Sequence, residues 1–100
     1  MINRLTPFHE ARRHLVVAGM RTIDTLIPVG ANRVVPPMGF TTWHQYADRL
    51  AQESRPADLW LLLGKGCSTL NSSIGVAKGD YRLALERIHR PADELKHALE

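Results

Sequence analysis

The chain has 100 residues, a hydrophobic fraction of 44% and a formal net charge of +3. This length suits one domain, and the apolar content is that of a globular protein, so the composition excludes a wholly disordered chain. No apolar run approaches the roughly 20 residues of a membrane span, and no signal-peptide pattern opens the sequence. The single cysteine, Cys67, cannot form an internal disulfide, which fits a reducing, cytoplasmic setting. We therefore expect one domain over residues 1–100.

The first predicted helix covers about residues 7–26. Thr6-Pro7 is typical of a helix N-terminus, because threonine caps the first turn and proline suits the first helical position. Apolar residues then recur at three- and four-residue steps, which indicates an amphipathic helix. Its expected core stripe consists of Phe8, Ala11, Leu15, Ala18, Thr22 and Leu26.

Prolines and glycines next predict an irregular loop around residues 28–41. Thr42 and Gln45 match a capping box at the start of a helix of about 43–53. The residues expected to point into the core from this helix are Trp43, Tyr46, Ala47 and Leu50.

The second half is expected to contain several short helices. Pro56 opens one, Gly64 is its expected end, and a short helix of about 68–73 follows. After a turn at Gly75, further helices are predicted over about 78–89 and from Pro91 onward. The predicted fold is therefore all-α, a small bundle of five or six short helices around the irregular loop.

One internal similarity accompanies these boundaries. Tyr46, Leu50 and the run Arg55 to Asp58 recur 35 residues later as Tyr81, Leu85 and the run Arg90 to Asp93. Two copies are too few for a solenoid. The similarity indicates either shared helix-boundary chemistry arising by chance or two similar helix–turn–helix units packed together.

The segment from Cys67 to Ile88, CSTLNSSIGVAKGDYRLALERI, resembles the helix-turn-helix of bacterial, phage and plasmid transcription regulators. Its spacing is nearest to that of plasmid repressors of the KorA/TrfB type. Ile74-Gly75-Val76 looks like the turn, where glycine permits the positive φ that reverses the chain. The resemblance implies a helix-turn-helix over residues 67–90.

The resemblance further implies a DNA-binding transcription regulator of phage or plasmid type that acts as a homodimer on double-stranded DNA. The second helix would enter the major groove by its N-terminal half, with phosphate contacts around it. The residues implied in DNA binding are Lys65, Ser68, Thr69, Lys78, Gly79, Arg82, Arg87 and Arg90.

Three residues of the same segment fit a different function. Asn71 stands where small residues usually face the second helix, Asp80 is acidic, and Leu83 is apolar on a face that would meet bases. These residues suit a small protein-interaction module, such as an inhibitor or adaptor of a larger protein. The two tryptophans are predicted to be core residues, although a partly exposed one would mark a partner site.

No catalytic residue, metal or cofactor is expected. His9 and His14 are separated by five positions, which places their rings on different sides of a helix. The run Gly64 to Thr69 lacks the spacing of a phosphate-binding loop. Cys67 is expected near a helix N-terminus, where its pKa would fall, but the sequence places no partner histidine beside it.

Overall fold

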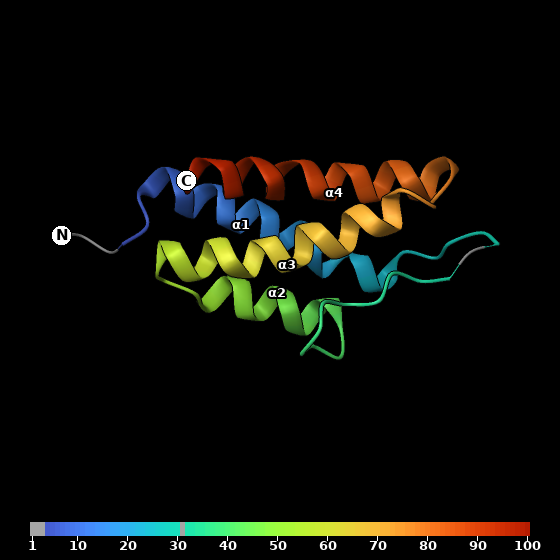
Figure 1. Cartoon of the computed structure of the whole chain (residues 1–100), viewed down its shortest axis with the longest axis horizontal. Helices are drawn as coiled ribbons and strands as arrows, with labels where there is room; N and C mark the ends of the chain where they lie inside the picture. Colours follow the sequence, from blue (N-terminus) through green and yellow to red (C-terminus); the bar gives the residue numbers. More distant parts are fainter. Residues whose placement is uncertain (1–3, 31) are drawn as a thin grey trace.

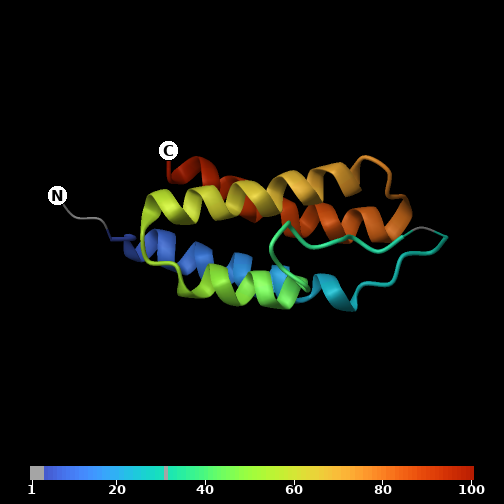
Figure 2. The same cartoon turned by 60° about the horizontal axis from the view of Figure 1, so that its bottom comes forward.

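The computed structural model describes residues 4–30 and 32–100, and these are helical apart from turns and one long connection (Figure 1). The elements are α1 (Pro7–Arg21), the 3₁₀ turn η1 (Ile23–Thr25), α2 (Trp43–Gln52), α3 (Pro56–Ile74) and α4 (Gly79–Ala98). Consecutive α-helices run antiparallel, which makes an elongated bundle of 50 × 23 × 18 Å (Figures 1 and 2). In this part of the chain, no helix combines the length and the hydropathy that crossing a bilayer requires.

The predicted helix starts at Thr6 and Thr42 are confirmed. The hydroxyl of Thr6 accepts the backbone N–H of His9 at 3.1 Å, and that of Thr42 accepts the N–H of Gln45 at 3.0 Å. The Gln45 side chain departs from the usual capping box, because it accepts the backbone N–H of Thr41.

A second cap comes from η1. Both carboxylate oxygens of Asp24 accept backbone N–H groups at the start of α2, from Trp43 at 3.0 Å and from His44 at 2.9 Å. These groups have no partner within the helix, and the negative charge complements the helix dipole. Asp24 therefore attaches the end of α1 to the start of α2 across the long connection.

The expected core stripe of the first helix is wrong. The buried residues of α1 are Arg13, Val16, Val17 and Met20. Phe8 and Leu15 are instead 56% and 61% exposed. Arg13 can occupy the buried row because its guanidinium donates to Glu10 Oε2 at 2.6 Å and to the carbonyl of Glu53.

The expected end of a helix at Gly64 is also wrong, because α3 continues to Ile74 and includes the short helix expected at 68–73. A glycine inside a helix costs about 1 kcal/mol, whereas burying a leucine side chain contributes about 1.5–3 kcal/mol. Leu63 and Leu70, on either side of the glycines, are fully buried. Burial along this row therefore outweighs the local weakness.

Pro91 does not begin a separate helix, since it lies inside α4. Proline removes one helical hydrogen bond and costs about 3 kcal/mol. Leu85 before it and Ala92 and Leu95 after it are fully buried. Packing against the bundle core therefore keeps α4 one continuous helix across Pro91. The described residues form four α-helices instead of the expected five or six.

The helix-turn-helix geometry is not confirmed. Such a motif crosses its helices at about 90–120°, whereas α3 and α4 lie side by side and antiparallel (Figures 1 and 2). The chain does reverse after Ile74, but Gly75 has a right-handed φ of −59°. The positive φ of +63° belongs to Gly79, the first residue of α4.

The irregular loop predicted around 28–41 is confirmed. This connection runs beyond the helix ends and returns to α2 (Figure 2). Val34 and Pro37 are the buried residues of its described part. The Val34 carbonyl accepts the indole N–H of Trp43 at 3.1 Å, and the Val34 N–H donates to the Tyr81 hydroxyl at 3.3 Å. The predicted inward face of α2 is confirmed as well, because Trp43, Tyr46, Ala47 and Leu50 are fully buried.

Candidate functional site

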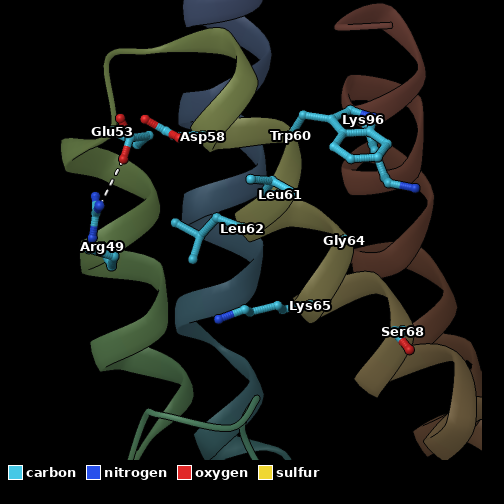
Figure 3. Close-up of a pocket in the computed structure, with 10 residues that line it drawn as sticks. All are labelled: Arg49, Glu53, Asp58, Trp60, Leu61, Leu62, Gly64, Lys65, Ser68 and Lys96. Carbon is cyan, nitrogen blue, oxygen red and sulfur yellow. Dashed lines mark hydrogen bonds and ion pairs between the residues drawn. The ribbon is translucent and has the colours of Figure 1, made fainter.

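An open groove of about 700 Å³ follows the outer side of α3 (Figure 3). This volume is in the range of about 300–1,000 Å³ found for ligand sites. Residues from α2, α3 and α4 and from the link between α2 and α3 line it: Arg49, Glu53, Asp58, Trp60, Leu61, Leu62, Gly64, Lys65, Ser68 and Lys96. We call this surface the α3 groove.

Trp60 is the aromatic residue of the α3 groove, and it is partly exposed. The ammonium group of Lys96 lies 4.9 Å from the centroid of its ring, which is cation–π distance. The indole N–H donates to a Glu100 carboxylate oxygen at 3.2 Å. A smaller apolar hollow lined by Ala57 and Leu99 continues the groove past the same ring. These contacts orient Trp60 while leaving part of its ring available.

Leu61, Lys65 and Ser68 share one face of α3, because they follow at helical spacing. Leu61 is 58% exposed, and the Lys65 and Ser68 side chains are exposed as well. The opposite face of α3 contains the buried leucines and therefore fixes this face outward. An exposed leucine beside a partly exposed tryptophan forms an apolar strip inside the groove.

The carboxylates that line the groove already have cationic partners. Glu53 pairs with Arg49 at 2.8 Å, and Asp58 pairs with Arg55 at 3.5 Å. The backbone N–H of Arg55, and then the Arg49 guanidinium, hold the pKa of Glu53 below its ordinary value against the effect of burial. Within residues 4–30 and 32–100, Lys65 and Lys96 form no ion pair. The uncompensated charge among the residues that line the α3 groove is therefore positive, and the Glu100 carboxylate lies at its edge, where it accepts the Trp60 indole N–H.

The structure separates the residues implied in DNA binding into groups. Lys65 and Ser68 belong to the α3 groove, and the Thr69 hydroxyl donates to the Lys65 carbonyl at 2.9 Å. Lys78 and Gly79 lie at the turn into α4. Three further exposed residues lie along α4, namely Arg82, which pairs with Glu86 at 2.9 Å, and Arg87 and Arg90. The eight residues therefore come from the middle of α3, the turn into α4 and the length of α4.

A second apolar surface lies at the end of the bundle where the long connection meets the turn between α3 and α4. Val29 is 98% exposed, and Ile27 and Val76 are exposed as well. Ile27 and Val29 line a hollow together with Lys78 and Tyr81. Leu83 is exposed and lies near the start of α4, which is at the opposite end of the bundle from the start of α3 (Figure 1), where Trp60 lies.

Cys67 lies in the middle of α3, so the expected position near a helix N-terminus is wrong. Burial, and then the negative charge of Asp93, raise the pKa of its thiol to about 11, whereas Lys96 lowers it. The structure also places His89 and Asp93 of α4 beside Cys67, with one ligand atom from each residue within 4.8 Å of the others. The sequence analysis missed this cluster, although His89 and Asp93 are one helical turn apart.

The chain matches no protein-family model, no curated protein and no solved structure in comparisons with known proteins.

Proposed function

We propose that this protein is a small protein-interaction module whose α3 groove binds a helical, amphipathic and acidic segment of a larger protein. The observation that carries the proposal is the exposed Leu61 beside Trp60, flanked by two lysines without ion-pair partners in the described part of the chain. The bundle would act as a rigid support for this surface.

The apolar strip supports a helical partner. Helices that bind in grooves place apolar residues from successive turns on one strip of the receptor. Ala57 and Leu61 lie one turn apart on α3 and give such a strip, with Trp60 beside them and Leu99, directly after α4, at its end. Tryptophan is among the residues that contribute most to binding at protein interfaces. Burying Leu61 and the exposed part of Trp60 would provide the main favourable contribution to the free energy of binding.

The charges support an acidic partner. Lys65 extends over the groove, and Lys96 lies across the ring of Trp60 (Figure 3). Carboxylates on the flanks of a docked helix would reach both ammonium groups, whereas basic side chains would be repelled. Complementary charges of this kind select partners and speed association more than they strengthen binding.

The test uses two synthetic amphipathic helical peptides with the same leucine face, one flanked by glutamates and the other by lysines. We expect the acidic peptide alone to shift the amide resonances of residues 57–68 and 96–100 in a ¹⁵N-labelled sample. Leu61→Glu should weaken its binding by about tenfold or more, as loss of a central apolar contact of over 1 kcal/mol does.

Leu83→Glu is the matched control, because Leu83 is 48% exposed and lies outside the groove. Its affinity for the acidic peptide should equal that of the unmodified chain. Equal binding of both peptides, or an equal loss in the two variants, would contradict docking in the α3 groove.

Duplex DNA binding by α4, the function implied by the resemblance, is the second candidate. It is favoured by Lys78, Arg87 and Arg90, which are exposed and form no ion pair within the described residues. Fluorescence anisotropy with random duplex DNA at two salt concentrations tests it. The expected result is affinity that falls steeply with salt and is reduced by Arg82→Ala with the fold intact. No binding at low salt would leave the α3 groove as the functional surface.

A further inference from the structure

We propose that Cys67, His89 and Asp93 form a binding site for a divalent transition-metal ion of the zinc type. A thiol sulfur, an imidazole nitrogen and a carboxylate oxygen converge there from two helices, all within 4.8 Å of one another. This site is separate from the α3 groove and does not depend on the proposed docking.

The packing of α3 on α4 builds the cluster. Cys67 belongs to the buried face of α3, between Leu63 and Leu70. His89 and Asp93 are one turn apart on α4, so their side chains lie one above the other on the same face. Because the two helices lie side by side along their length (Figures 1 and 2), this face of α4 reaches the middle of α3.

The present distances between the three ligand atoms are close to those of a metal site, so small side-chain movements would complete it. Zinc binds cysteine sulfur at about 2.3 Å and histidine nitrogen or carboxylate oxygen at about 2.0–2.2 Å. In a tetrahedral site these lengths place neighbouring ligand atoms about 3.4–3.6 Å apart. Closing the cluster from its present separation, at most 4.8 Å, requires movements of about an ångström, which rotation of half-buried side chains can supply.

The donor set selects the class of metal. Thiolate and imidazole ligands favour zinc and similar ions over magnesium and calcium, which prefer oxygen ligands. Three protein ligands leave a fourth tetrahedral position for water, as in zinc sites with an open coordination position. The thiolate and carboxylate together balance the two charges of the ion.

The ligand atoms are available for a metal. Among the described residues, no hydrogen bond involves the Cys67 thiol, the His89 ring or the Asp93 carboxylate under ordinary geometric criteria. His97 Nδ1 lies 3.5 Å from Asp93 Oδ2, but it donates to the Asp93 backbone carbonyl at 2.8 Å and so leaves the carboxylate free to turn toward a metal.

Metal binding also changes the protein. The thiol proton of Cys67 passes to solvent as the bond between sulfur and metal forms, with no change in oxidation state. The ion then links α3 to α4 in the folded state only, so it raises stability by mass action. Zinc at 100 times its dissociation constant should raise the unfolding temperature by about 10 °C or more in a domain of this size.

The test is a titration of the full chain with Co²⁺ under reducing conditions. We expect stoichiometric binding with a thiolate-to-cobalt charge-transfer band in the near ultraviolet and strong visible bands typical of four-coordinate cobalt. Cys67→Ser should abolish the charge-transfer band, and His89→Gln, which removes a direct ligand, should weaken binding by more than the roughly 10- to 100-fold that lost outer-shell contacts cost.

His14→Gln is the control, because His14 is exposed on α1 and outside the cluster. It should bind Co²⁺ as the unmodified chain does. Circular dichroism verifies that each variant is folded, and His89→Gln, at a half-buried position, keeps the test valid if Cys67→Ser unfolds. No charge-transfer band in the unmodified chain, or equal affinity in all variants, would overturn the proposal.

Discussion

Gly66→Ala is expected to lower the free energy of unfolding by about 3 kcal/mol, although alanine is the better helix former by about 1 kcal/mol. A Cβ atom at this position would lie 2.6 Å from Cζ and 2.8 Å from Cε2 of Tyr46 and would collide with the Tyr46 hydroxyl. Tyr46 has no space to move, because it is fully buried and packs edge-on against Trp43 and Phe40.

The collision would also break a hydrogen bond. The Tyr46 hydroxyl donates to the Leu62 carbonyl at 2.7 Å, one turn before Gly66. A buried hydroxyl left without a hydrogen-bond partner costs about 1–3 kcal/mol, which contributes to the expected loss of stability. Urea unfolding followed by circular dichroism measures the loss, and the midpoint of thermal unfolding should fall by about 10 °C or more.

Gly64→Ala is the matched control in the same helix. Its Cβ would meet only Lys96 Cε, at 3.6 Å, which is an ordinary contact with a flexible side chain. The helix propensity of alanine should then raise stability by about 0.5–1 kcal/mol. Opposite signs for the two variants are the expected result. A Gly66→Ala variant as stable as the unmodified chain would contradict the close approach of α2 to α3.

Trp43→Ala is expected to lower the free energy of unfolding by about 3–5 kcal/mol, the range for removing a large aromatic side chain from a core. Trp43 is fully buried, and its ring lies 5.5 Å from that of Tyr46. Its indole N–H holds the carbonyl of Val34, so the variant would also release the long connection. With native stabilities of about 5–15 kcal/mol, such a loss leaves a marginal fold.

Circular dichroism in urea measures this effect, and amide exchange should show faster exchange in residues 32–41 than elsewhere. Trp60→Ala is the control, because Trp60 is partly exposed and its indole N–H donates to the side chain of Glu100 near the C-terminal end of α4. Its loss of stability should be well below that of Trp43→Ala. Comparable losses in the two variants would contradict the assignment of one tryptophan to the core and the other to the α3 groove.

Several features followed from local chemistry alone. The caps at Thr6 and Thr42, the inward face of α2 and the irregular connection after α1 were all predicted, because each depends on residues close together in the sequence. The partly exposed tryptophan was considered, but the sequence could not say which of the two it was. The α3 groove and the cluster around Cys67 needed the packing of α3 against α2 and α4.

The two similar segments, which end at Asp58 and at Asp93, show most clearly what local sequence and tertiary packing each decide. Around Pro56 the helix breaks, because the Glu53 carbonyl accepts Arg13 and the Glu53 carboxylate accepts the N–H of Arg55. Around Pro91 the same local pattern stays helical.

The sequence by itself determined that the protein is helical, where most helices begin and which residue types cap them, since these depend on short-range propensity and hydrogen bonds. Only the tertiary structure decided which of two apolar rows of α1 is buried and whether a glycine or proline ends a helix. It also decided which side chains of α3 stay exposed. The physical reason is that burial against distant helices contributes as much free energy as the local preferences it overrides.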